Sequence, residues 1–328
     1  MSNEELIKII DQMNEEQFFN LCEEFFDILS IKYMNRVPGI YHPNNQIVEI
    51  AQKKGLVCLP IHFYSPVPTK DEIRNYNARN YSTQGINWND TVQLNYLYKS
   101  KEIQEDLIYT SISKQNVFDF FWDNGAFSHS DAAFYYSLIQ LVQPKRIIEV
   151  GAGNSTKLAI NSLLKLQRNV SQILSIVEPY PSDDLLKCAE KYDIKIIDSK
   201  IQDVSIDIFE QLKEDDIIFY DGSHVSKYGS DVNYFLFTIL PILNKGVFVH
   251  IHDIFLPDEM PKKWVDELNL YWNEQYLLHA FLMYNQDFEI IFSSMYLSSK
   301  YKKEMDEALT SPLRYKGNGG GSIWLRKK

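Results

Sequence analysis

The chain has 328 residues, 45% hydrophobic and 14% aromatic, which is enough for one large α/β domain with an added segment. Its 33 basic and 44 acidic residues give a net charge of −11, which argues against a general nucleic-acid or anionic-membrane surface, because neutralising phosphates requires clustered Lys and Arg. Cys22, Cys58 and Cys188 lie far apart without CxxC spacing, so we expect reduced thiols and a cytoplasmic protein.

Residues 1–124 are expected to form a mostly helical and irregular segment ahead of the main domain. The opening "MSNEELIKII" is acidic and lacks the positive start and long apolar core of a secretory signal. Apolar residues recur at helical spacing up to about residue 36, and from residue 38 to 124 the pattern breaks up. We expect this segment to serve as a lid or as a substrate-binding region.

From residue 125 to 328 the pattern predicts an α/β domain with a doubly wound, mostly parallel sheet. Apolar runs that alternate with helical stretches imply crossover connections, and strands that are apolar on both faces imply helices on both sides. The most apolar region, 234–256, is interrupted by Pro, Lys and Gly, so we expect no membrane span. The expected strands are 146–150, 172–178, 194–198, 216–221 and 247–252, and the expected helices lie near 155–167, 182–192, 205–213 and 230–243.

The last part of the chain is expected to complete the sheet. A helix is predicted near 262–283, followed by apolar runs at 288–297 and 321–327. The "NGGGS" before the final run is interpreted as a flexible loop tip.

A glycine-containing turn, "RIIEVGAGNSTKLAI" at 146–160, joins the first expected strand to a helix. Gly151 and Gly153 allow a ligand to approach the backbone, and Asn154 or Ser155 could cap the helix. In such sheets ligands bind beyond the carboxyl ends of the strands. Glu178 ends the next strand, where a carboxylate would accept hydrogen bonds from ribose hydroxyls. The third position of a dinucleotide fingerprint is Thr156 and not glycine, which makes NAD less favoured without excluding it, and the pattern as a whole favours an adenosine-type ligand.

These segments resemble a known family. "IIEVGAGNST", "IVEPYP" and "IIFYDGSH" look like motifs of class I S-adenosylmethionine-dependent methyltransferases, closest to a bacterial subgroup with "DGSH" and "HDIFLP"-like motifs. The resemblance covers about residues 125–327. It implies a Rossmann-like fold with seven strands, the last antiparallel and reached by a hairpin from the sixth, and a catalytic domain that binds S-adenosylmethionine.

The resemblance also implies roles for particular residues. Those around the glycine turn would surround the methionine part of the cofactor, and those after the second and third strands would hold its ribose and adenine. Asp221 would lie beside both the methionine and the acceptor. The cofactor-binding residues expected are Glu149, Gly151, Gly153, Asn154, Ser155, Glu178, Pro179, Tyr180, Gln202, Asp203 and Asp221.

A cluster of His and Asp follows the fourth and fifth strands, which the resemblance places side by side. Asp221 and His224 follow the fourth strand, while His250, His252 and Asp253 lie in or after the fifth. Single histidines of this set could be structural, but a structural role for the whole set is disfavoured, because buried polar groups are costly without partners. Alternatively, His252 or His224, oriented by a carboxylate, could remove the acceptor's proton as a neutral base near its usual pKa of about 6.5.

A divalent metal is the third interpretation of this cluster. Related O-methyltransferases bind a metal through acidic residues after the fourth and fifth strands, and Asp221, His252 and Asp253 stand at those positions. The candidate ions are Mg, Mn, Fe and Zn, and an imidazole ligand favours the last three over Mg.

The sequence thus predicts a methyltransferase that uses S-adenosylmethionine on a small-molecule acceptor, through O-methylation of a sugar or secondary metabolite. The catalytic candidates are His252, His224 and Asp221. Two alternatives stay open at this point: a metal-dependent oxygenase or hydroxylase that uses the His/Asp cluster on the same fold, and a non-catalytic protein that binds S-adenosylmethionine. Homo-oligomer formation is also left open.

Overall fold

The computed structural model describes residues 2–37, 40–43, 45–57, 61, 63–76, 81–103, 107, 110–127, 129–309 and 320–328. The contacts among them divide the chain into two compact units, Met1–Asn75 and Tyr76–Lys328. By its contacts, the stretch 76–124 therefore belongs with the sheet, while the role of residues 1–124 as a lid or substrate-binding region stays a prediction. Cys58 lies outside the described residues.

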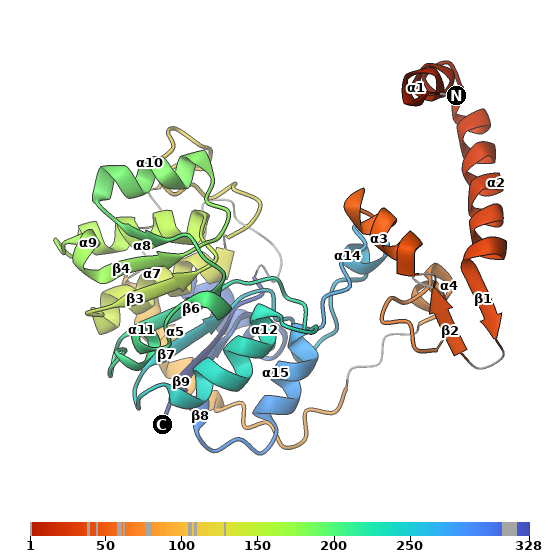
Figure 1. Ribbon diagram of the computed structural model, residues 1–328. Helices are drawn as coiled ribbons and strands as arrows, with labels where there is room; N and C mark the ends of the chain where they lie inside the picture. The colour runs from red at the N-terminus through yellow and green to blue at the C-terminus, as the bar shows by residue number, and fades with distance from the viewer. Residues whose placement is uncertain are drawn as a thin grey trace. The chain divides into compact units, whose positions relative to one another are not determined.

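The first unit is mainly helical, as expected. Its first helix begins with a capping box, in which Ser2 Oγ accepts from the Glu5 N–H and the Glu5 carboxylate accepts from the Ser2 N–H. A two-stranded antiparallel sheet, which the sequence pattern did not predict, follows the second helix. The elements are α1 Asn3–Asp11, α2 Glu15–Tyr33, β1 Met34–Val37, β2 Ile40–Pro43, α3 Asn45–Lys53 and α4 Lys70–Asn75 (Figure 1).

The second unit contains the predicted doubly wound sheet. Its seven strands lie in the order β5-β4-β3-β6-β7-β9-β8, and only β9 runs antiparallel to its neighbours. This order confirms the predicted fold class, including the antiparallel last strand. The strands are β3 Ile147–Val150, β4 Leu174–Val177, β5 Lys195–Ile197, β6 Ile217–Tyr220, β7 Phe248–Ile251, β8 Phe288–Ser293 and β9 Ile323–Lys327.

Helices cover both faces of the sheet, and each face has its own hydrophobic core. One core takes side chains from α5, α7, α8 and α10, and the other from α11, α12, η2 and α15. In Figure 1, α8 and α10 lie on one side of the sheet and α12 and α15 on the other. Among the described residues, none of the helices combines the length and hydrophobicity that a membrane crossing requires. The helices named here are α5 Asp90–Ile103, α7 His129–Val142, α8 Asn154–Lys165, α10 Asp183–Tyr192, α11 Asp207–Glu210, α12 Asp231–Tyr234, η2 Phe235–Ile239 and α15 Glu274–Leu282.

Two predicted elements differ in the structure. The helix expected at 262–283 is split into α14 Lys262–Asp266 and α15, because the N–H groups of Asn273 and Glu274 donate to the His224 carbonyl and begin a new helix there. The strand expected at 288–297 ends at Ser293, where α16 Ser294–Lys300 begins, followed by α17 Lys302–Ala308. The expected hairpin is therefore wrong: β8 and β9 pair, but helices lie between them in the chain.

One carboxyl group is buried in the sheet itself. Glu149 in β3 is fully buried, and it accepts a hydrogen bond of 2.5 Å from Ser155 Oγ of α8. Its Oε2 has no hydrogen-bond partner. Burial raises the pKa of Glu149 to about 8, since the hydrogen bond from Ser155 does not compensate for lost solvation. At neutral pH the group is therefore mainly protonated in the folded protein.

This burial makes stability depend on pH in a defined direction. Between about pH 4.5 and 8 the unfolded chain releases the Glu149 proton and the folded chain retains it. The free energy of unfolding therefore falls by up to roughly 1.4 kcal/mol for each pH unit in this range. We expect Glu149→Gln to remove this contribution. Denaturant unfolding at pH 5 and pH 8 should show the variant gaining stability relative to the parent as pH rises. The exposed Glu190→Gln is the matched control, and a constant difference at both pH values would contradict the assignment.

Candidate functional site

The register of the parallel strands brings the site residues to one edge of the sheet. The first residue beyond each strand donates its N–H to the last residue of a neighbouring strand. Gly151 donates to Val177 at 3.1 Å, and Asp221 donates to Val150 at 2.9 Å. The remaining pairs are Glu178 to Ile197 at 3.1 Å and His252 to Tyr220 at 3.1 Å.

The turn after β3 lies directly against the end of β6. Gly151 has φ +77°, and a Cβ there would overlap the backbone carbonyl of Asp221. Gly153 precedes α8 and has open space where a Cβ would lie. The expected cap differs: Asn154 is already the first helical residue, and Ser155 instead donates to Glu149.

A cavity of about 450 Å³ opens at this edge of the sheet. Six of the expected cofactor-binding residues line it: Gly151, Glu178, Pro179, Tyr180, Gln202 and Asp221. The rest of its lining comes mainly from the turns after β5 and β6, up to the start of α12. The volume lies within the range of roughly 300–1,000 Å³ that small-molecule sites occupy.

Hydrogen bonds fix the orientation of two side chains that line this cavity, those of Glu178 and Gln202. The carboxylate of Glu178 accepts from the N–H of Ala152 at 3.2 Å and of Tyr180 at 2.8 Å, which leaves further lone pairs for a ligand. Gln202 donates through Nε2 to the Gly229 carbonyl at 2.8 Å. This bond fixes the amide of Gln202, which lines the cavity, and leaves its buried Oε1 without a hydrogen-bond partner among the described residues.

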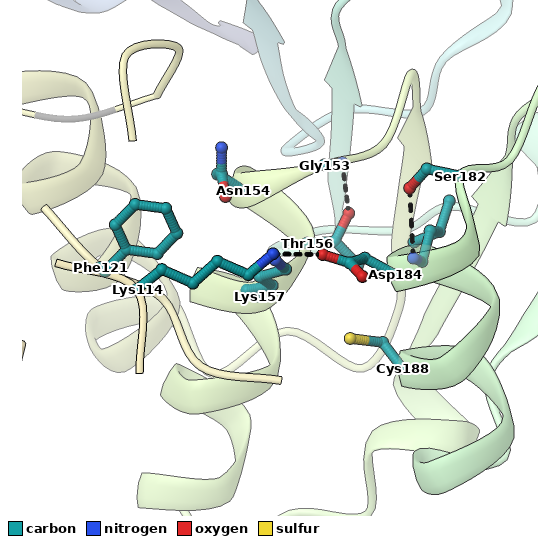
Figure 2. A pocket seen from close by; sticks show the side chains of 10 residues that line it. Lys114, Phe121, Gly153, Asn154, Thr156, Lys157, Ser182, Asp184 and Cys188 are labelled. Carbon is teal, nitrogen blue, oxygen red and sulfur yellow. Dashed lines mark hydrogen bonds and ion pairs between the residues drawn. The ribbon is translucent and has the colours of Figure 1, made fainter. Parts of the chain in front are cut away.

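The other expected cofactor-binding residues lie elsewhere. Glu149 and Ser155 are buried and bonded to each other behind the turn. Asp203, in the short 3₁₀ turn η1 Ile201–Asp203, is exposed and does not line the cavity. Gly153 and Asn154 line a second cavity at the start of α8 (Figure 2).

The predicted His/Asp cluster is assembled beside Asp221. His252 Nδ1 lies 3.5 Å from Asp221 Oδ2 and 3.7 Å from Asp253 Oδ1. His224 Nε2 lies 3.2 Å from Asp221 Oδ1 and 3.7 Å from Asp253 Oδ2, and its Nδ1 lies 3.0 Å from Glu274 Oε2. Ligand atoms of Asp221, His252 and Asp253 all lie within 4.8 Å of one another, close enough for one metal ion.

The carboxylates give both imidazoles a positive charge at neutral pH. Burial opposes that charge in His224, but hydrogen bonds with Asp221 and Glu274 outweigh it and raise its pKa to about 10. In His252 burial is likewise outweighed, chiefly by the charges of Asp221 and Asp253, so its pKa lies well above the usual value. Burial also opposes ionisation of Asp221, yet the two imidazoliums lower its pKa. This differs from the neutral imidazole that the sequence analysis expects as a base.

His250 has a structural environment. It lies in β7, two residues before His252, and the ring centroids of the two histidines lie 5.7 Å apart. Its Nε2 lies 2.7 Å from Ser322 Oγ, and its ring stacks on Phe219 at 3.8 Å. Burial holds the pKa of His250 well below its usual value, so the ring is neutral.

Asp131 and Glu274 belong to the cluster but were not among the expected site residues. Asp131, in the first turn of α7, is buried with its Oδ2 at 3.6 Å from His252 Nε2. It also accepts from the N–H groups of Gly321 at 2.9 Å and Ser322 at 3.0 Å. The end of the "NGGGS" stretch is therefore not a free loop tip but is fastened to the site. The one available clue was a charged residue among the apolar side chains of α7.

Comparisons with known proteins found similar chains among solved structures and among protein sequences. No protein-family model matches the sequence. Among solved structures, an S-adenosylhomocysteine-bound methyltransferase from Podospora anserina, PaMTH1, is 18% identical with a TM-score of 0.38, covering 83% of this chain and 98% of that one. A structure of CmcI-N160 in its apo form is 12% identical with a TM-score of 0.33, covering 60% of this chain and 70% of that one.

A third structure, an S-adenosylmethionine-dependent methyltransferase from Archaeoglobus fulgidus, is 10% identical with a TM-score of 0.32, covering 60% of this chain and 94% of that one. These scores are low, so the fold assignment rests on the strand order of this chain itself. In sequence, an uncharacterized protein from Archaeoglobus fulgidus is 30% identical over 173 residues, which are 50% of this chain and 78% of the archaeal protein. At this identity and coverage, the chain belongs to the same family as that archaeal protein.

Proposed function

We propose that this protein transfers a methyl group from S-adenosylmethionine to an oxygen of a small acceptor, a sugar or a secondary metabolite. The observation that supports this most is the cavity at the carboxyl ends of β3, β4, β5 and β6. Its lining includes the turn at Gly151, the carboxylate of Glu178 and the amide of Gln202, whose Oε1 has no partner among the described residues. Asp221 lines the cavity on the side of the His/Asp cluster.

The polar groups of this cavity suit the nucleoside part of the cofactor. Glu178 has lone pairs left to accept from ribose hydroxyls. Gln202 Oε1 is buried and lacks a donor, and the exocyclic amino group of adenine would supply one. Pro179 and Tyr180 would lie beside the purine, and Gly151 beside the methionine.

The reaction is an in-line displacement, so the main tasks of the protein are to align the acceptor hydroxyl with the methyl group and to let the hydroxyl proton leave. The acceptor oxygen forms a bond to the methyl carbon as the carbon–sulfur bond breaks, which yields S-adenosylhomocysteine and releases the hydroxyl proton. Asp221 stands where the cavity meets the His/Asp cluster, and we place the acceptor there. His224 holds its carboxylate from one side and His252 from the other.

We further propose that Asp221, His252 and Asp253 bind a divalent cation. Their converging oxygen and nitrogen atoms fit one ion, and a mixed donor set favours Mn, Fe or Zn over Mg. A bound cation would lower the pKa of an acceptor hydroxyl beside it. His252 must lose its proton to serve as a ligand, so we expect cation binding to release protons. His224, paired with Glu274, is left to balance the charge of the carboxylates.

The adenine contact can be tested through ligand preference. We expect calorimetry to show S-adenosylhomocysteine binding about tenfold tighter than its inosine analogue, which replaces the amino donor with an oxygen that faces Gln202 Oε1. In Gln202→Leu this preference should disappear, whereas Asp203→Asn, outside the cavity, should retain it. Equal affinities of the parent protein for both ligands would place the purine elsewhere.

The cation site can be tested without activity measurements. Titration with Mn²⁺, followed by the electron paramagnetic resonance of free Mn²⁺, should show one site, lost on adding EDTA. Asp253→Asn should weaken binding at least tenfold; Asn tolerates the φ of +54° at this position. The exposed Glu267→Gln is the control. The proposed cation site is contradicted if the parent protein binds no more Mn²⁺ than Asp253→Asn does.

Turnover tests the reaction class. We expect label from S-[methyl-³H]adenosylmethionine to appear in a hydroxylated acceptor from a panel of sugars and polyphenols. His252→Ala should retain S-adenosylhomocysteine binding and lose most of the turnover, because the cavity is lined without this residue. Transfer only to amines, or full activity of both His252→Ala and His224→Ala, would contradict the proposed chemistry.

A further inference from the structure

A second cavity, of about 280 Å³, shares none of its lining residues with the first. It is formed by the first turns of α8 and α10 and by the segment around Lys114 and Phe121 (Figure 2). Gly153 lines this cavity, whereas Gly151 lines the first one. Its lining residues are Lys114, Phe121, Gly153, Asn154, Thr156, Lys157, Ser182, Asp184, Leu185 and Cys188.

Lys157 is the unusual residue of this cavity. It lies in the first turns of α8 and is only 7% exposed, although lysine is rarely buried without a partner. Among the described residues, its ammonium makes no hydrogen bond or ion pair. Its charge acts on Asp184, the one carboxylate of the lining, but Lys114 already pairs with that carboxylate, so an anion in the cavity would supply the counter-charge that the second lysine lacks.

The surroundings of Lys157 add positive potential. Lys114 Nζ reaches into the same cavity, where it pairs with Asp184 Oδ2 at 2.7 Å (Figure 2). The two lysines face one carboxylate, so the lining keeps a net positive charge in a chain whose net charge is −11. At the N-terminus of α8 the Gly153 N–H donates to Thr156 Oγ1 at 3.0 Å, but Gly153 offers no side-chain acceptor to the N–H groups of the first turn, and these favour an anion. By contrast, Ser182 already caps α10.

We propose that this cavity binds the phosphate group of a small ligand, with Lys157 as its main counter-charge and Lys114 and the start of α8 as further contacts. The volume lies just below the range of small-molecule pockets, roughly 300–1,000 Å³, so it suits one anionic group with few attached atoms. Phe121, Leu185 and Cys188 give the rest of the wall an apolar character that would accept the organic part of a phosphate ester.

This site does not rest on the methyltransferase proposal. Neither lysine lines the first cavity, and none of the residues of the His/Asp cluster lines the second. Phosphate binding can therefore be measured in the absence of any cofactor, and its failure would leave the proposed function untouched.

The experiment is calorimetry with inorganic phosphate at constant ionic strength, with chloride as the reference anion. We expect saturable phosphate binding by the parent protein and none of chloride. Lys157→Met, which keeps the length and apolar stem of the side chain, should bind phosphate at least tenfold more weakly, and Lys114→Met should bind it more weakly than the parent. Lys165→Met, at the exposed end of the same helix, is the matched control and should bind like the parent.

Two further binding measurements identify the class of ligand and test whether the two cavities bind independently. Phenyl phosphate that binds more tightly than inorganic phosphate would indicate an ester, and the reverse order would indicate the free anion. Saturating S-adenosylhomocysteine should leave phosphate affinity unchanged. The proposal is overturned if phosphate and chloride behave alike, if folded Lys157→Met and Lys114→Met bind phosphate as the parent does, or if S-adenosylhomocysteine displaces phosphate.

Discussion

The shared register of the parallel strands is the constraint on which the site depends. Because the hydrogen-bond ladder continues for one residue beyond β3, β4, β6 and β7, Gly151, Glu178, Asp221 and His252 are held level by backbone bonds. The contact between the Gly151 backbone and the Asp221 carbonyl leaves no room for a side chain at that point. The sheet therefore fixes the position of the cavity, although most of the residues that line the cavity belong to turns.

The charges at this edge are mutually compensated. Three acidic groups, Asp131, Asp221 and Asp253, surround His252, and Glu274 holds the far side of His224. Removing such charges from water is costly, so each needs a partner close by. The arrangement also draws distant parts of the chain together, since Asp131 binds the backbone at the start of β9, where a Cβ at Gly320 would overlap its carboxylate.

Much of the fold follows from sequence pattern, because apolar runs between helical stretches determine a parallel sheet wherever each run is buried on both faces. The resemblance to class I methyltransferases, and not this rule, predicted that the ends of β6 and β7 would meet, and therefore the grouping of Asp221 with His252. The break before α15 was not predictable in this way, since it depends on a carbonyl of His224 fifty positions earlier. The role of Asp131 likewise depends on pairing between α7 and the far end of the chain. The charge state of the imidazoles required the distances to four carboxylates, which no spacing in the sequence gives.

The central claim is that one edge of the sheet holds a nucleoside beside a cation. A crystal structure of the protein grown with S-adenosylhomocysteine and Mn²⁺, with anomalous data collected for manganese, tests it most directly. The account predicts ribose oxygens against Glu178, the purine amino group against Gln202 and one anomalous peak among Asp221, His252 and Asp253. A nucleoside bound outside this cavity, with Gln202 Oε1 satisfied by the protein itself and no peak at the cluster, would contradict it.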